Sequence, residues 1–175
     1  FVGLADAMAD GGVSWDPNMV LCEAVVFGDD PAVRTRLQTE YDVQGAAFPH
    51  PYSANWSAES RAAAREAFPA MLSVVKALHD RGVLLTLGSD TMNPWMTPGA
   101  SALRELELMV EAGLTPAEAL AVGTRNGARA LGILDETGTL EVGKAADLLV
   151  LGADPTTDIS AVRALQYVVA AGTVW

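Results

Sequence analysis

The chain has 175 residues, half of them hydrophobic and 19% charged, so it is long enough to bury a substantial core. Its 22 acidic residues outnumber 11 basic ones and give a net charge of −11, which argues against nucleic-acid partners and against binding to anionic membrane surfaces. No apolar run approaches the ~18 residues of a membrane-spanning helix, and a single cysteine excludes an internal disulfide.

The first forty residues predict a helix, a strand and a second helix. Residues 4–10 resemble the end of a helix that stops at Gly11-Gly12. The apolar segment 13–26 predicts a strand that enters a loop, and Cys22 within it is interpreted as a small buried residue and not as a nucleophile. Aspartate before Pro31 predicts the start of a helix that continues to about Tyr41.

Residues 42–57 form an irregular, aromatic segment, and long connections of this kind often act as lids or binding loops. His50 lies between two prolines and has two interpretations, as a surface histidine of the loop or as a substrate contact. The tryptophans Trp15, Trp56 and Trp95 are open to a similar choice between lining a pocket and burying core area.

Ser57 can cap a helix whose apolar residues recur at three- and four-residue spacing. Pro69 lies inside this pattern and predicts a kink or a second helix start. The helix ends at Arg81-Gly82, and residues 83–87 predict a strand directly after it. This alternation of helices and strands indicates α/β layers with a parallel sheet.

Short helices follow the second strand. Ser101 is a candidate cap for a helix over residues 102–112, and Thr115-Pro116-Ala117-Glu118 has the pattern of a capping box. Thr124 is a candidate cap for a final short helix that ends at Gly132. Asn126 and Arg129 are expected to cap or pair locally.

The pattern changes at residue 133, where a small β module is expected. Residues 138–143 predict a strand and tight turn, and residues 146–151 predict a second strand. Residues 167–175 predict a hairpin that turns at Ala171-Gly172. Asp147 is expected to fix a turn before its strand.

Asp90 carries the strongest chemical signal, because it closes the buried strand in the sequence Gly88-Ser89-Asp90-Thr91. It is either a turn aspartate or a functional carboxylate at the end of a strand, where α/β proteins place their ligands. Such a carboxylate could bind a divalent metal, act as a general base, or do both. By contrast, His79 lies at a helix C-terminus, where the helix dipole alone accounts for it.

Three segments carry a family resemblance. They are residues 76–82 leading into Gly88-Ser89-Asp90-Thr91, residues 104–120 continuing through residues 128–132, and residues 138–151. In this order they resemble the C-terminal portion of the amidohydrolase superfamily, in the branch of the imidazolonepropionase-like enzymes and the Xaa-Pro dipeptidases. The resemblance implies an α/β fold, with residues 1–132 forming the last strands and helices of a distorted (β/α)₈ barrel. Residues 133–175 would supply C-terminal strands of a small β-sandwich.

The resemblance also implies chemistry. It implies a metal-dependent hydrolase of C–N bonds, acting on a small amide, cyclic amide or dipeptide through a metal-activated water. Asp90 would be both metal ligand and proton shuttle for one or two divalent ions, zinc being the expected metal, and Asn93, Trp95 and His50 would contact substrate. No nucleic-acid or membrane partner is expected, a homo-oligomer is compatible with the pattern, and the expected compartment is the cytoplasm.

The sequence departs from the family pattern, because it lacks a His-x-His pair and neither His50 nor His79 follows a strand. The remaining ligands are therefore expected upstream of Phe1, in a longer parent enzyme. Two alternatives stay open at this point. One is a non-catalytic fragment or degenerate subunit that needs a partner, and the other is an unrelated α/β binding domain that uses the aromatic segment 48–56.

Overall fold

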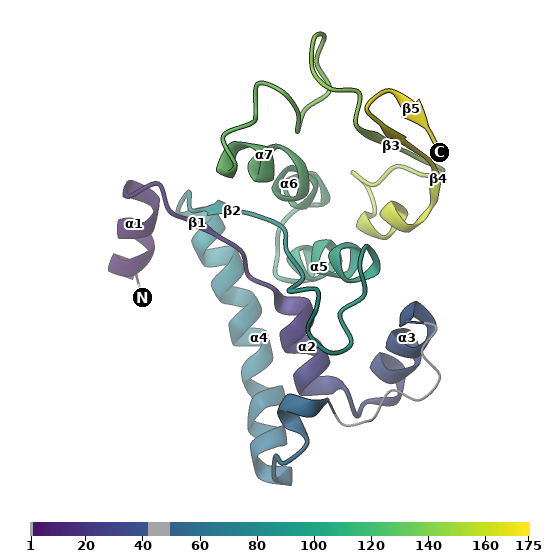
Figure 1. Cartoon of the computed structure of the whole chain (residues 1–175). Coiled ribbons are helices and arrows are strands. Elements are labelled where there is room, and N and C mark those ends of the chain that lie inside the picture. Colours follow the sequence, from purple (N-terminus) through teal and green to yellow (C-terminus); the bar gives the residue numbers. More distant parts are fainter. Residues whose placement is uncertain (1, 42–49) are drawn as a thin grey trace.

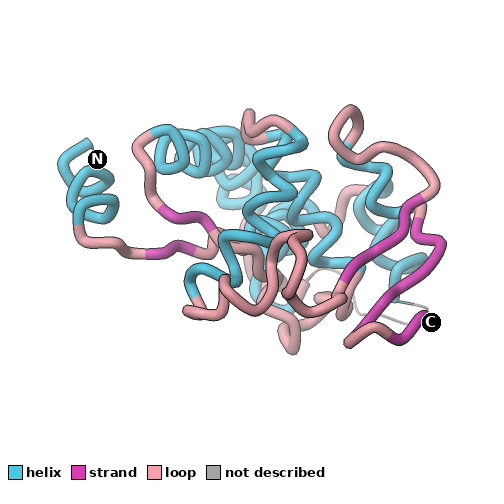
Figure 2. The backbone as a smooth tube through the Cα atoms, turned by 90° about the horizontal axis from the view of Figure 1, so that it is seen from above, coloured by secondary structure: helices cyan, strands magenta, loops and turns pink. Residues whose placement is uncertain are grey.

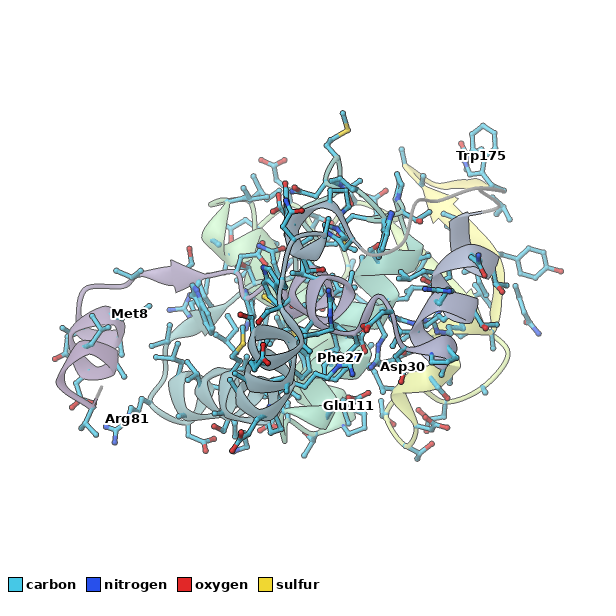
Figure 3. All side chains as sticks on the ribbon, turned by 90° about the horizontal axis from the view of Figure 1, so that it is seen from below. Met8, Phe27, Asp30, Arg81, Glu111 and Trp175 are labelled. Carbon is cyan, nitrogen blue, oxygen red and sulfur yellow. The ribbon has the colours of Figure 1, made fainter. Side chains whose placement is uncertain are left out.

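The computed structural model describes residues 2–41 and 50–175, so Phe48 of the aromatic segment lies outside the described residues. The helices fill the middle of the molecule, with a pair of short strands toward one end and a three-stranded sheet at the other (Figures 1 and 2). Figure 3 shows the same separation, with Met8 and Arg81 far from Trp175. No helix in the described part of the chain is both long and apolar enough to cross a bilayer.

The described residues of the N-terminal half form four α-helices, a 3₁₀ turn and two short strands. In chain order these are α1 (Val2–Asp10), β1 (Ser14–Trp15), α2 (Met19–Phe27), α3 (Pro31–Tyr41), η1 (Pro51–Ser53), α4 (Ala58–Asp80) and β2 (Leu84–Leu85). Strands β1 and β2 pair in parallel, with Ser14 opposite Leu84 and Trp15 opposite Leu85. The predicted parallel α/β arrangement is therefore present, although each strand is shorter than expected.

Of the strand predicted to enter a loop over residues 13–26, only β1 is present, and the rest of the prediction is wrong because residues 19–27 form helix α2. This helix buries Met19, Val20, Ala24 and Val26 on more than one side, against α4 and α5. A helix that is apolar all round has no 3.6-residue pattern, and a short apolar run of this kind cannot be distinguished from a buried strand by periodicity. Cys22 is half-buried in this helix, and burial raises the pKa of its thiol, in agreement with a packing role.

Helix α4 begins as predicted, since the Ser57 hydroxyl accepts a hydrogen bond from the Ser60 amide at 3.1 Å. The predicted second start at Pro69 is wrong, because α4 continues through the proline to Asp80. Burial of Phe68 and Val75 in the core stabilises both halves of the helix and offsets the backbone hydrogen bond that the proline removes. Figure 1 shows α4 running alongside α2.

After β2 come α5 (Ala100–Glu111), α6 (Pro116–Ala121), the π-helical turn η2 (Val122–Asn126) and α7 (Gly127–Ala130). The capping box at Thr115 is confirmed, because its hydroxyl accepts from the Glu118 amide and Glu118 accepts from the Thr115 amide at 2.7 Å. Two predicted caps are wrong. Ser101 lies inside α5 and accepts from Thr97 N, while Thr124 lies inside η2 and donates to the Leu120 carbonyl.

The C-terminal sheet contains β3 (Leu148–Leu151), β4 (Leu165–Ala170) and β5 (Thr173–Val174), with the 3₁₀ turn η3 (Ile159–Arg163) between β3 and β4. The strands are antiparallel in the order β3-β4-β5, and the predicted turn is confirmed, with positive φ at Ala171 and Gly172. Asp147 accepts from the Ala171 amide at 2.7 Å, so it holds the turn between β4 and β5, and not the turn before its own strand that was expected. The strand predicted over residues 138–143 is wrong, because this segment is loop and turn, held by Lys144.

Candidate functional site

Two carboxylates lie at the carboxyl ends of the parallel strands. Asp16 follows β1 directly, and Asp90 follows β2 after four intervening residues. Both side chains are exposed, and the two charges interact. Partial desolvation raises the pKa of Asp16, hydrogen bonds from Gly88 and Asn18 oppose this, and the charge of Asp90 raises it further. The edge of the sheet is therefore electronegative, which favours a cation.

Asp16 was not among the predicted site residues, because the strand was expected within residues 13–26 and only the structure ends it at Trp15. Its carboxylate packs against Gly88, where an added Cβ would lie 2.1 Å from Asp16 Oδ2. Only glycine leaves room for the carboxylate at this position. The carboxylate thus ties the end of β1 to the segment that leads to Asp90.

Asp90 begins a short loop, residues 90–95, that we call the site loop. Three of its residues have positive φ without being glycine: Asp90 at 51°, Met92 at 97° and Trp95 at 69°. A residue in such a conformation costs on the order of 1–3 kcal/mol, and the conformation persists only where surrounding contacts fix it. Here the amide and side chain of Asn93 both donate to the Asp90 carbonyl at 3.1 Å.

His50 lies against the site loop and is fully buried, so its interpretation as a surface histidine is wrong. Its Nε2 is 2.9 Å from the Pro94 carbonyl and its Nδ1 accepts from the Tyr52 amide at 3.2 Å. This pair of contacts requires the neutral tautomer with the proton on Nε2. Burial lowers the pKa of the imidazole, against the opposing effect of the Pro94 hydrogen bond, and so keeps the ring neutral at pH 7.

The structure brings all four predicted site residues together. The Trp95 ring packs against His50 with centroids 4.6 Å apart in an edge-to-face arrangement, and both side chains are buried. Asn93 is half-exposed beside the exposed Asp90. Substrate contact by His50, Asn93 and Trp95 stays a prediction, because burial gives the first and last of them a clear packing role.

Within residues 2–41 and 50–175, the candidate metal ligand is the carboxylate of Asp90. Among the described residues, no group of three His, Cys, Asp or Glu side chains is close enough to hold an ion, and no side chain hydrogen-bonds to the Asp90 carboxylate. The exposed Asp90 carboxylate is therefore free to bind an ion, and carboxylate oxygen is a ligand for zinc and for other divalent ions. Asp90 fits a metal site whose other ligands come from outside the described residues.

Two other polar residues have structural contacts away from this site. His79 pairs with Glu118 at 3.3 Å, at the opposite end of α4 from the site loop. Asn126 was expected to pair locally, but its amide donates to the Leu85 carbonyl at 3.1 Å, which holds β2 from a distance of 41 residues. Neither contact places a reactive side chain at the carboxyl ends of the strands.

Comparisons with known proteins identify the fold around this site. The sequence profile described as "Amidohydrolase family" matches residues 57–174, which is more than half of the chain and includes Asp90. The chain belongs to the amidohydrolase family. This confirms the resemblance drawn from the three sequence segments.

Among curated amidohydrolase relatives, the imidazolonepropionase of Bradyrhizobium diazoefficiens is 46% identical over 81 residues. This alignment covers 43% of the chain and 19% of the relative, so the chain spans about a fifth of the length of such relatives. The imidazolonepropionase of Rhizobium meliloti is 42% identical over 89 residues, covering 50% of the chain and 21% of the relative.

Solved structures extend the likeness to nearly the whole chain. A Xaa-Pro dipeptidase with bound methionine in its active site superposes with a TM-score of 0.69 at 22% identity, covering 100% of this chain and 37% of that protein. A molinate hydrolase gives a TM-score of 0.53 at 30% identity, with 79% of this chain and 29% of that protein covered. The mixed helix and strand arrangement of this amidohydrolase chain is therefore one already seen in enzyme structures.

Proposed function

We propose that this chain is the C-terminal part of a metal-dependent amidohydrolase that hydrolyses C–N bonds in small amides, cyclic amides or dipeptides. Residues 1–132 would complete a (β/α)₈ barrel and residues 133–175 would contribute to a small β-sandwich. The observation that carries the proposal is the exposed Asp90 carboxylate, which lies at the end of a parallel strand on a braced loop. In barrels of this type, catalytic residues lie at the carboxyl ends of the strands.

In the proposed reaction, Asp90 has two tasks. Its carboxylate would hold a divalent ion, for which we propose zinc, together with ligands supplied by sequence outside this chain. The ion would supply Lewis-acid activation of water and of the scissile carbonyl. The carboxylate would accept a proton from the attacking water and deliver it to the leaving nitrogen, so that the product departs as a neutral amine.

Metal removal tests this proposal in the full-length protein. Wild-type protein is assayed on a panel of dipeptides, simple amides and cyclic amides, before and after dialysis against a chelator. Because a catalytic ion contributes several kcal/mol of transition-state stabilisation, hydrolysis should fall by ~100-fold or more and return on addition of zinc. Full activity in protein shown by elemental analysis to be metal-free would contradict the proposal.

A second candidate is a non-catalytic chain that is stable only with a partner. It is favoured by an apolar groove between α2 and α4, whose lining includes Leu21, Cys22, Val25, Trp56 and Met71. Cooperative unfolding of the isolated 175-residue chain as a monomer, without binding of a dye that recognises exposed apolar surface, would count against it.

A further inference from the structure

We propose that Tyr52 and His50 form a latch that positions Asp90, and that the Tyr52 hydroxyl sets metal affinity and turnover without supporting the fold. The latch rests on the proposed function, because Asp90 must be the working carboxylate for its position to affect catalysis. Tyr52 and His50 are positioning residues in this account and do not touch the reacting atoms.

The site loop needs such a latch because its conformation is not one that its sequence favours. Asp90, Met92 and Trp95 all have positive φ, and an isolated loop with this sequence would leave that region of backbone space. Met92 is 95% exposed, so its own side chain does little to fix the loop. The Asp90 carbonyl is held from within the loop by Asn93, so contacts from other segments act on Asp90 by holding Asn93 and the end of the loop.

The first contact is made through Asn93. The Tyr52 hydroxyl donates to Asn93 Oδ1, and Asn93 Nδ2 donates to the Asp90 carbonyl at 3.1 Å. An amide side chain has one acceptor and two donors, so the tyrosine also determines which way the Asn93 amide faces. Without the hydroxyl, the side-chain amide can rotate away from the Asp90 carbonyl, which then keeps only the hydrogen bond from the Asn93 backbone amide.

The second contact is made by His50 at the other end of the loop. Its ring holds the Pro94 carbonyl and packs on Trp95, as described above. Trp95 is also close to Gly28 at the end of α2, where an added Cβ would lie 2.5 Å from Trp95 Cζ3. The Trp95 ring is thus enclosed between α2 and the histidine.

The two contacts are joined in a single short segment. His50 Nδ1 accepts from the Tyr52 amide, so the imidazole orients the backbone of the residue whose hydroxyl holds Asn93. The latch therefore holds the site loop at Asn93, Pro94 and Trp95, which follow Asp90 in the chain, whereas Asp16 packs against Gly88, which precedes it.

At Tyr52, an effect on the position of Asp90 can be measured separately from an effect on the stability of the fold. Its side chain is 55% exposed, and its hydroxyl is not buried in the core. Removing that hydroxyl leaves the ring in place and creates no cavity. A purely structural role would therefore predict almost no change in any property of the Tyr52→Phe protein.

The test compares Tyr52→Phe with Tyr167→Phe in the full-length protein. Tyr167 lies in β4 with 53% exposure, in the C-terminal sheet and away from the site loop, so it is a matched control. Zinc affinity is measured by competition with a chelating dye, and kcat and KM are measured on the dipeptide or amide that wild-type protein hydrolyses best. Thermal unfolding is followed for each variant.

Loss of a group that orients a metal ligand typically weakens metal affinity or activity by about 10–100-fold. We expect losses of that order in zinc affinity and kcat for Tyr52→Phe, a much smaller change in KM, and an unchanged melting temperature in zinc-free protein, where weaker zinc binding has no effect on stability. Tyr167→Phe should match wild type throughout. Wild-type zinc affinity and kcat in Tyr52→Phe would overturn the latch, and so would failure of this variant to fold.

An Asp90→Asn variant separates the two proposals. If Asp90→Asn loses zinc and activity while Tyr52→Phe behaves as wild type, the latch is wrong and the proposed function stands. If the wild-type protein neither binds zinc nor hydrolyses any of the panel, the proposed function is wrong and the latch is overturned with it.

Discussion

Replacing Asp90 by asparagine in the full-length protein is expected to lower kcat by about 10²–10⁴-fold, the usual contribution of a positioned general acid–base group. The amide is neutral and cannot accept a proton from water at neutral pH. Asparagine also tolerates the left-handed conformation that Asp90 adopts at φ 51°, so the loop backbone should be kept. The side chain is exposed, so the substitution should not change the melting temperature of zinc-free protein.

The matched control for this change is Asp10→Asn, an exposed aspartate that ends α1, lies on the amino-terminal side of β1 and precedes Asp90 by 80 residues. Steady-state kinetics and thermal unfolding of both variants give the comparison. If both Asp90→Asn and Asp10→Asn retained the wild-type kcat, Asp90 would be a turn residue and not the proton shuttle.

The second large effect is expected at Glu105, whose carboxylate is fully buried on α5. Its two oxygens accept hydrogen bonds from the amides of Met19 at 2.9 Å and Val20 at 2.6 Å. These are the first amides of α2, and the residue before them, Asn18, makes no side-chain cap. Glu105 thus caps a helix that lies more than eighty residues earlier in the chain.

Glu105→Ala should lower the free energy of unfolding by about 3 kcal/mol, because two buried amides lose their acceptor and a cavity is left. Glu105→Gln should cost about 1–3 kcal/mol, since its amide nitrogen would face one of these donors. Denaturant unfolding measures both, with exposed Glu66→Ala on α4 as the control. Wild-type stability in Glu105→Ala would contradict the assigned capping role.

The same residue predicts a pH dependence. Burial raises the pKa of Glu105 to about 7, the amides of Met19 and Val20 oppose this, and the charges of Asp16 and Glu23 raise it further. The folded protein therefore holds this proton at pH values where the unfolded chain has released it. The contribution of Glu105 to stability is full below pH 4.5 and is lost as the pH rises through about 7, and Glu105→Gln should lack that dependence.

The features that sequence predicted well depend on residues close together in the chain. The caps at Ser57 and Thr115 use hydrogen bonds to residues three positions away, and the hairpin turn at Ala171-Gly172 depends on two adjacent backbone conformations. The parallel arrangement followed from the order of elements, which constrains strand direction through the crossover helix.

The features that sequence missed depend on tertiary contacts. Helix α2 has no amphipathic pattern because it is buried on several sides, and its N-terminal cap, Glu105, is distant in sequence. The candidate site likewise contains one residue that local sequence could identify and one that it could not. Asp90 could be recognised from its place after a strand, but the role of Tyr52 depends on a hydrogen bond to a residue 41 positions away.

The most direct test of the central claim is a crystal structure of the full-length protein grown with zinc, with anomalous diffraction recorded at the zinc edge. The account predicts an anomalous peak beside the site loop, with an Asp90 carboxylate oxygen about 2.0–2.2 Å from the ion. A fully occupied zinc site to which Asp90 contributes no ligand would contradict the account.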